Sequence, residues 1–313
     1  MGTKKIIGFI GLGSLGHAIA LNLAEKARLD YVYNRTHDKT IPYKEKGIAA
    51  ASSVKELAGA CDIVFTIVSD DQALSSFTEG PDGLAAHLKK GGIHISMSTI
   101  LPATASSLHR LHRQHGSYYI AGPVLGRPEA ARARKLNFCL AGDPAAKQQI
   151  QDLLTDAGAA KVWDYGEDPQ SANTAKLCSN FMLVAALESM AEGLALAEES
   201  KVDKGTVMSM LSQTIFNCPI YTNYGTAIVE EKYLPAGFSL RMGQKDVRLV
   251  KEQADKVGLP MPFADVLRQR LENCIKAGLG DHDLAAIALD VTRQTAPVHG
   301  HSLSASPRKK SGL

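Results

Sequence analysis

An apolar run near the start of the chain leads directly into a glycine-rich turn. Residues 6–10 read Ile-Ile-Gly-Phe-Ile, and Gly11, Gly13 and Gly16 follow with the spacing Gly-x-Gly-x-x-Gly. The apolar run predicts a buried strand, and the apolar periodicity after Gly16 predicts a helix. In such a unit the first glycine permits a tight turn, the second lets a pyrophosphate approach the backbone, and the third lets helix and strand pack closely. The sequence therefore predicts a dinucleotide-binding turn formed by Gly11, Leu12, Gly13, Ser14, Leu15 and Gly16.

The residues after the second predicted strand indicate which dinucleotide binds. Residues 31–33 read Tyr-Val-Tyr, and Asn34, Arg35 and Thr36 follow them. An NAD site usually carries a carboxylate here, which binds the ribose 2′-hydroxyl. A carboxylate would repel a 2′-phosphate, whereas the Arg35 guanidinium can pair with it and the Thr36 hydroxyl can donate to it. We therefore predict NADP(H) as the cofactor, with NAD(H) as the alternative if Arg35 is only a solvated cation.

Length and composition restrict the class of protein. The chain has 313 residues, 45% of them hydrophobic and 21% charged, which suits two globular domains. A formal net charge of +3 predicts no nucleic-acid partner. The first predicted strand begins so close to Met1 that we expect no signal peptide. No apolar run approaches the roughly 20 residues that cross a membrane, so we predict a cytoplasmic protein.

Neither the cysteines nor the histidines predict a metal site. The cysteines are scattered and odd in number, which is typical of reduced thiols; they are Cys61, Cys139, Cys178, Cys218 and Cys274. His109, His112 and His115 follow one another at i, i+3 and i+6 with no cysteine or carboxylate in register. We interpret these histidines as part of an exposed helix face.

The first half of the chain alternates strand and helix patterns, which predicts an α/β Rossmann-type doubly wound parallel sheet. Further strands are expected over residues 62–68, 93–98, 117–124, 136–140 and 161–163. Asp168 and Pro169 then resemble an N-cap and a first helical position. We place the dinucleotide-binding domain at residues 1–166.

The second half is helical in pattern. A helix over about 170–199 would span roughly 45 Å at 1.5 Å per residue and would join the two domains. Further helices are expected over residues 206–211, 227–231, 244–257, 262–277 and 283–292. We predict an all-α domain for substrate binding and dimerisation over 167–295, and a disordered tail over 296–313, which is rich in Ser, Pro and Lys.

Lys176 is the strongest candidate for acid–base chemistry. Its neighbours in the long predicted helix are apolar, an expensive setting for an ammonium unless it faces a site. Desolvation would favour the neutral amine, which suits a lysine that transfers a proton. Asn180 lies four residues on and shares its helix face. The alternative is a lysine whose ammonium reaches solvent from the flank of the helix.

Several motifs, taken in order, resemble the β-hydroxyacid dehydrogenase family. They are the turn 11–16 with Asn34-Arg35-Thr36, Ser98-Thr99, the stretch 122–126 (Gly-Pro-Val-Leu-Gly), Lys176 with Asn180, and Lys245-Asp246. The family includes 3-hydroxyisobutyrate dehydrogenase, tartronate semialdehyde reductase, glyoxylate/succinic semialdehyde reductases and 6-phosphogluconate dehydrogenase. The resemblance extends over nearly the whole chain, to about residue 295. It implies an NADP(H)-dependent oxidoreductase that acts on a small aldehyde, keto acid or 3-hydroxy acid.

The resemblance also implies roles for individual residues. Lys176 would be the general acid in reduction and the general base in oxidation, and Asn180 would hold the reacting oxygen or the substrate carboxylate. Thr99 would lie near the nicotinamide, and the backbone around Leu125 and Gly126 would bind the carboxylate. Lys245 would close the site from the second domain, with Asp246 ordering its helix. Val68 and Ser69 would border the cofactor.

The chain departs from the family pattern in the substrate turn. Leu125 replaces a serine whose hydroxyl meets the substrate carboxylate, and Arg127 replaces a glycine. Arg127 could supply a bidentate contact to the carboxylate instead, or point to solvent. The pattern Gly126-Arg127-Pro128-Glu129-Ala130 also resembles imine reductases, although these usually lack the catalytic lysine.

Three functions therefore stay open at this point. The first is the NADPH-dependent reductase, the second an imine reductase, and the third a non-catalytic dinucleotide-binding module that serves in interactions. The apolar faces of the helical domain also predict a homodimer or tetramer.

Overall fold

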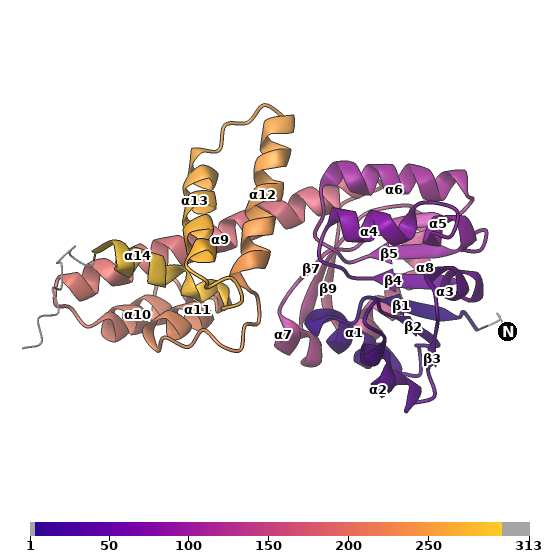
Figure 1. The fold of residues 1–313 in the computed structure, drawn as a ribbon, viewed down its shortest axis with the longest axis horizontal. Helices are drawn as coiled ribbons and strands as arrows, with labels where there is room; N and C mark the ends of the chain where they lie inside the picture. Colours follow the sequence, from indigo (N-terminus) through magenta and orange to yellow (C-terminus); the bar gives the residue numbers. More distant parts are fainter. Residues whose placement is uncertain (1–3, 296–313) are drawn as a thin grey trace, which may run out of the picture.

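The computed structural model describes residues 4–295, which form an α/β part and a helical part (Figure 1). The α/β part is built on a six-stranded parallel sheet with the order β3-β2-β1-β4-β5-β6. Its strands are β1 (Ile7–Ile10), β2 (Tyr31–Tyr33), β3 (Ala49–Ala50), β4 (Ile63–Thr66), β5 (Ile93–Ser96) and β6 (Tyr118–Ala121). This strand order is that of a doubly wound dinucleotide-binding sheet, in which ligands bind where the order reverses, between β1 and β4.

Helices cover both faces of this sheet, as the alternating sequence pattern predicts. On one face α1 (Ser14–Glu25) and α8 (Pro144–Ala157) pack on the sheet through side chains such as Ile19, Ile150 and Phe9. On the other, α3 (Val54–Ala60), α5 (Leu84–His87) and α6 (Pro102–Gln114) cover the sheet. The shorter helices are η1 (His37–Thr40), α2 (Ile41–Lys44), α4 (Asp71–Thr78) and α7 (Pro128–Arg132).

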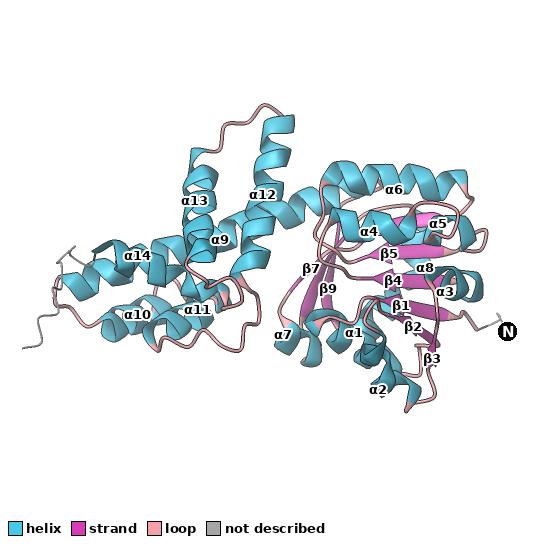
Figure 2. Ribbon diagram, viewed as in Figure 1, coloured by secondary structure: helices cyan, strands magenta, loops and turns pink. Residues whose placement is uncertain are grey.

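A second, three-stranded sheet extends the α/β part (Figure 2). It contains β7 (Val124–Leu125), β8 (Leu136–Leu140) and β9 (Ala159–Asp164) in the order β7-β8-β9. The predicted single strand over 117–124 is therefore wrong, because the chain leaves the parallel sheet at Gly122 and Pro123. Pro123 has no N–H to donate to a strand ladder, and the chain turns there to pair with β8.

The helix α9 (Pro169–Glu199) joins the two parts and runs through the helical part (Figure 1). The side chain of Asp168 accepts from the backbone N–H of Gln170, and Pro169 is the first helical residue, as predicted. Among the described residues, α9 alone is long and apolar enough to cross a membrane. Its most apolar 18-residue window is 44% buried within the protein. Because α9 packs against both parts and buries Lys176, Asn180 and Glu188, it has the character of a core helix.

Five more helices complete the helical part. They are α10 (Lys204–Gln213), α11 (Pro219–Val229), α12 (Leu240–Lys256), α13 (Pro262–Lys276) and α14 (Ala288–Thr295), with the short η2 (Leu284–Ile287) before α14. The helix expected over 227–231 begins two turns earlier, at Pro219, and the segment expected as one helix over 283–292 divides at Ala288. The predicted tail 296–313 lies outside the described residues.

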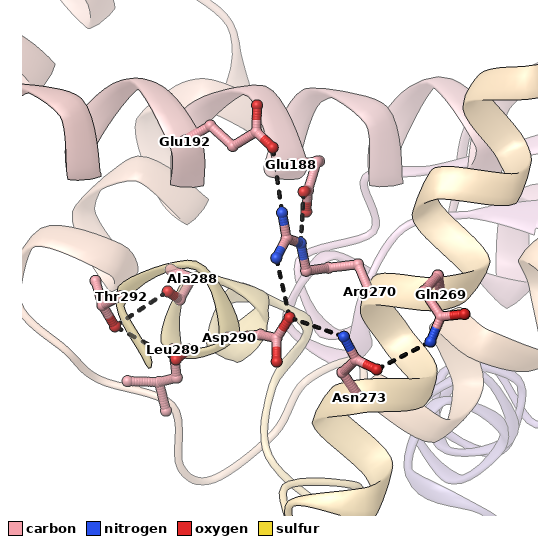
Figure 3. A network of polar contacts seen from close by, with 9 residues as sticks. All are labelled: Glu188, Glu192, Gln269, Arg270, Asn273, Ala288, Leu289, Asp290 and Thr292. Carbon is pink, nitrogen blue, oxygen red and sulfur yellow. Dashed lines mark hydrogen bonds and ion pairs between the residues drawn. The ribbon is translucent and has the colours of Figure 1, made fainter. Parts of the chain in front are cut away.

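Arg270 joins three helices of this part in one ion-pair network (Figure 3). Its guanidinium donates to Glu188 at 2.7 Å and Glu192 at 3.2 Å, both on α9, and to Asp290 on α14 at 3.0 Å. The Arg270 side chain is only 12% exposed. The network therefore fixes α13 against α9 and α14 inside a largely apolar core.

The interpretation of the three histidines as an exposed face is wrong for His112. This residue is fully buried, because Ala105, Leu108 and His112 share the face of α6 that packs on the sheet. Its Nε2 lies 2.9 Å from Nδ1 of His94, and its Nδ1 lies 2.8 Å from the Ser117 hydroxyl. Burial lowers the pKa of His112 to about 3, so the two rings form a neutral hydrogen-bonded pair.

Candidate active site

The glycine turn lies between β1 and α1, at the carboxyl edge of the parallel sheet. Gly11 has φ +98°, and a Cβ there would meet the Ile67 carbonyl oxygen at 2.0 Å. A Cβ on Gly16 would meet the Gly11 carbonyl oxygen at 2.1 Å. At both positions any other residue would collide with backbone, whereas a Cβ on Gly13 would meet nothing within 4 Å. The first and third glycines are thus required by packing, and the second faces open space.

The start of α1 fits a bound pyrophosphate. Gly13 is its N-cap residue, and no side chain caps the first N–H groups. The first turn also contains no acidic residue. Uncapped N–H groups and the positive end of the helix dipole attract phosphate oxygens. The open space at Gly13 and the free donors of α1 together form a cradle for a dinucleotide.

The predicted 2′-phosphate residues lie on the loop after β2. The Asn34 amide joins this loop to the glycine turn, because its Oδ1 accepts from the Leu12 N–H at 2.8 Å and its Nδ2 donates to the Thr36 carbonyl at 2.9 Å. An aspartate could accept the first bond but could not donate the second. Arg35 and Thr36 are exposed, and Arg35 has no hydrogen-bond or ion-pair partner among residues 4–295.

The loops after β4 and β5 are fixed to each other. The Val68 N–H donates to the Ser98 hydroxyl at 2.9 Å, and the Leu101 N–H donates to the Asp71 carboxylate at 2.9 Å. Ser69, next to Val68, is exposed. Thr99 lies between the two fixed points and is half-buried. The two loops therefore present Val68, Ser69 and Thr99 at the carboxyl edge of the parallel sheet, after β4 and β5.

Lys176 is buried without a directly bonded counter-charge among residues 4–295. Its side chain is on α9, which packs on β6 and β8, and the residue is 8% exposed. The ammonium makes no hydrogen bond or ion pair with any described residue. Burial lowers the pKa of Lys176 to about 8, and the nearby Asp246 carboxylate partly opposes that shift. An amine with this pKa exchanges a proton readily near neutral pH.

Asn180 and Lys245 connect Lys176 to the other predicted residues. The Asn180 Nδ2 donates to the Asp246 carboxylate on α12. The neighbouring Lys245 ammonium lies 2.6 Å from the same carboxylate and donates to the Thr99 carbonyl at 2.8 Å. This last bond crosses from the helical part to the sheet edge. The structure thus brings Lys176, Asn180, Lys245 and Thr99 into one cluster around Asp246.

The substrate turn predicted from the resemblance follows β7. Gly126 has φ +147°, and a Cβ there would meet the Leu136 side chain at 2.5 Å, which explains the glycine. Leu125 is half-buried and packs with apolar side chains that include Ala172 of α9. The Arg127 side chain stays 35% exposed, but its guanidinium is turned toward the helical part. Its Nη2 donates to the Asp283 carboxylate of the helical part at 2.7 Å.

Sequence reasoning did not foresee the contacts of four residues that hold this region together, and two of them, Asp71 and Asp283, it did not consider for the site at all. Ser98, Asp71 and Asp283 act through contacts to the backbone or to Arg127. Asp246 does more than order its own helix, because it also accepts from Asn180. Ser98 and Asp246 belong to the motifs themselves, whereas no local pattern drew attention to Asp71 or Asp283. Among the described residues, no group of three or more His, Cys, Asp or Glu side chains could hold a metal ion.

Two family models match the chain. Residues 6–166 match the NAD binding domain of 6-phosphogluconate dehydrogenase. Residues 171–289 match the NAD-binding domain of NADP-dependent 3-hydroxyisobutyrate dehydrogenase. Their boundary falls between Gly166 and Ser171, where α9 begins.

Individual relatives agree with these matches. The chain is 38% identical over 281 residues to the uncharacterized oxidoreductase YfjR of Bacillus subtilis, covering 90% of this chain and 98% of the relative. It is 28% identical over 287 residues to glyoxylate/succinic semialdehyde reductase 2, chloroplastic, of Arabidopsis thaliana, covering 92% and 79%.

Solved structures share the fold at lower identity. The 3-hydroxyisobutyrate dehydrogenase of Salmonella typhimurium superposes with a TM-score of 0.80 at 22% identity, covering 91% of this chain and 99% of that one. The imine reductase of Myxococcus stipitatus in complex with NADP+ gives a TM-score of 0.62 at 20% identity, covering 91% and 99%.

Proposed function

Because the chain belongs to the β-hydroxyacid dehydrogenase family and is an NAD(P)-dependent oxidoreductase of that kind, we propose that it uses NADPH to reduce a small aldehyde or keto acid. Lys176 is the general acid of this reaction. The reverse reaction, oxidation of a 3-hydroxy acid, uses the same lysine as general base.

The chemistry divides between the cofactor and the chain. When bound, the nicotinamide supplies or accepts the hydride. The Lys176 ammonium gives its proton to the carbonyl oxygen of the substrate, and the alcohol returns it in the reverse direction. Asn180 holds that oxygen through the amide hydrogen that Asp246 does not use. Thr99 borders the site from the α/β part, and Lys245 borders it from the helical part. The backbone at Leu125 and Gly126 holds the substrate carboxylate.

The observation that carries the proposal is the buried ammonium of Lys176. A buried charge without a partner is costly, and proteins rarely retain one without a function. Its pKa of about 8 means that both protonation states are populated near neutral pH. The cluster that surrounds it consists of the residues that the motif pattern assigns to the site.

Preference for NADP(H) is part of the same proposal. Arg35 and Thr36 are exposed on the loop that Asn34 ties to the glycine turn, and no carboxylate occupies that position. An unpaired guanidinium there suits a 2′-phosphate. The names of the solved imine reductase and of the family model supply independent support, since both mention NADP.

Initial rates of NADPH and NADH oxidation test the function. The panel consists of glyoxylate, succinic semialdehyde, tartronate semialdehyde, the uncharged methylglyoxal and a cyclic imine. We expect turnover of a short carboxylated aldehyde, faster with NADPH than with NADH. Turnover of the imine alone would replace the proposal by imine reduction, for which the apolar Leu125 in the substrate turn is the favouring observation. Tight NADPH binding without turnover of any member would favour a non-catalytic dinucleotide-binding module.

A further inference from the structure

Arg127 forms a contact between the substrate turn and the helical part. The turn 125–127 is held on one side by β7, which pairs with β8, and on the other by α7, which begins directly after Arg127. The Arg127 side chain leaves this rigid frame and reaches Asp283, which is 156 positions away in the sequence. The Arg127 side chain therefore links the position of the substrate turn to the position of the helical part.

The guanidinium lies in a partly open pocket of the helical part, which is formed by Asp283, Tyr224 and Gly237. The Asp283 side chain is only 5% exposed, and its Oδ2 accepts from Arg127 at 2.7 Å and from the backbone N–H of Gly237 at 2.9 Å. The guanidinium carbon lies 5.2 Å from the ring centroid of Tyr224, within cation–π range. A Cβ on Gly237 would meet Arg127 Nη2 at 2.0 Å, so the pocket has room for the guanidinium only because residue 237 is glycine.

This pocket is continuous with the helix that carries Lys245. Gly237 and Phe238 immediately precede α12, and the Leu284 N–H donates to the Phe238 carbonyl at 2.8 Å. Leu284 also packs on Gly243 of α12, where a Cβ would meet its Cδ1 at 2.5 Å. Displacement of the guanidinium would weaken the packing of residues 237–243, which lie about two helical turns or less before Lys245. The bond from Lys245 to Thr99 thus anchors α12 itself to the sheet edge, and the ion pair from Arg127 to Asp283 anchors the segment before α12, to which Asp283 is bonded through Gly237, to the substrate turn.

We propose that Arg127 is a positioning residue that, through Asp283, holds the substrate turn 125–127 at a fixed distance from α12 and Lys245, a role that rests on the proposed function. Because its charge is matched by Asp283, the guanidinium does not serve as the receptor of the substrate carboxylate. The carboxylate is held by the backbone of the turn, and Arg127 acts on it through the geometry of that turn.

Gly237→Ala and Arg127→Met test the proposal together. The alanine displaces the guanidinium without changing any charge, and Gly59→Ala, where a Cβ meets nothing within 4 Å, is its control. Arg110→Met, which removes an exposed arginine bonded only to serines of its own helix, is the control for Arg127→Met. We expect both test variants to lower kcat/KM by about 10²-fold, since misplacement by about 1 Å costs that much. KM should rise and kcat fall together, as for residues that set domain geometry.

Three further results are expected. Arg127→Lys keeps a charge that can pair with Asp283 but loses the planar group over Tyr224, so it should recover activity only in part, to within about tenfold of the wild type. The double variant Arg127→Met, Gly237→Ala should be no worse than either single variant, because both break one contact. The dissociation constant of NADPH should stay unchanged, and amide hydrogen exchange at Gly237 should become faster in Arg127→Met.

Other results would overturn the proposal. Loss restricted to carboxylated aldehydes, with methylglyoxal unaffected, would make Arg127 a substrate receptor. A lower melting temperature with unchanged kcat/KM would make the ion pair merely structural. A wild-type protein that turns over no substrate would overturn the proposed function alone. The Arg127–Asp283 contact would then be tested by amide hydrogen exchange. Unchanged exchange at Gly237 in Arg127→Met would overturn the positioning role of Arg127.

Discussion

Two lysines of this molecule are buried to the same extent in opposite ways. Lys147 on α8 and Lys176 on α9 are each 8% exposed. The Lys147 ammonium donates to the Asp164 carboxylate at 2.6 Å and to the Gly166 carbonyl at 3.0 Å. Lys176 donates to no described residue, and burial lowers its pKa to about 8. The difference teaches that the partner of a buried charge, rather than its burial, distinguishes a structural lysine from a candidate for catalysis.

Substitution of each lysine by alanine should separate the two roles. Lys176→Ala should lower kcat by about 10²- to 10⁴-fold, the usual range for general acid catalysis, and leave the melting temperature unchanged or higher. Lys147→Ala should leave kcat near the wild-type value and lower stability, because it removes the packed lysine stem and its bonds to the Asp164 carboxylate and the Gly166 carbonyl. Steady-state kinetics and thermal unfolding of both variants make the comparison. Near-normal turnover of Lys176→Ala would contradict the catalytic role.

Arg270 extends the structural side of the comparison to a denser network (Figure 3). Arg270→Met should lower the free energy of unfolding by about 3–5 kcal/mol, because the buried Glu188 loses its counter-charge. Burial already raises the pKa of Glu188, against the opposing effect of Arg270. Urea unfolding measures the loss. Arg268→Met is the control on the same helix, because within residues 4–295 Arg268 has a single ion pair, the more exposed one with Glu272. An equally large loss in the control would contradict the assignment.

The His94–His112 pair shows a third solution, a titratable group kept neutral. The native pKa of His112 is about 3, whereas an unfolded histidine titrates near 6.5. Between these values the unfolded state binds more protons, so the free energy of unfolding falls as the pH falls below about 6.5. At pH 5 this amounts to about 2 kcal/mol from His112.

His112→Gln should therefore show a weaker loss of stability between pH 7 and pH 5 than the wild type. His115→Gln alters an exposed ring of the same helix and should keep the wild-type slope. Urea unfolding at both pH values provides the measurement. Equal slopes in all three proteins would mean that His112 titrates in the native state as it does in the unfolded state.

The pH dependence of the rate applies the comparison to Lys176 itself. Reduction requires the ammonium, so kcat should be level below about pH 8 and fall up to tenfold per pH unit above it. Oxidation requires the neutral amine, so its rate should fall as the pH decreases below about 8. Rates in both directions between pH 6 and pH 10 check the sign. A reduction rate that stays level to pH 10 would exclude Lys176 as the acid.

Local sequence patterns predicted the glycine turn, the start of α9 and the shared face of Lys176 and Asn180. Each of these depends on residues a few positions apart. The Asn180–Asp246 bond joins residues 66 positions apart, and the Arg127–Asp283 pair spans 156 positions. No local pattern contains such pairings. The sequence therefore left two alternatives open for Arg127, a contact with the substrate carboxylate or a side chain that points to solvent. His112 was misread for a related reason, since its polarity indicated solvent although its spacing from Leu108 placed it on the buried face.

Arg35 is a further cation to compare, one that is exposed and that also lacks a partner in the part of the chain that the structure describes. Solvent stabilises its charge, so the absence of a partner costs little here and indicates a ligand less strongly than at Lys176.

Arg35→Glu should raise the dissociation constant of NADPH by at least about tenfold, because it removes a charge-assisted hydrogen bond and adds repulsion. Binding of NADH, which lacks the 2′-phosphate, should change little and is the internal control. The effect should shrink as ionic strength rises, because an exposed pair is screened. If Arg35→Glu weakened the binding of NADPH and NADH equally at low salt, Arg35 would stabilise the loop rather than bind the 2′-phosphate. The cofactor preference would then have to come from another residue.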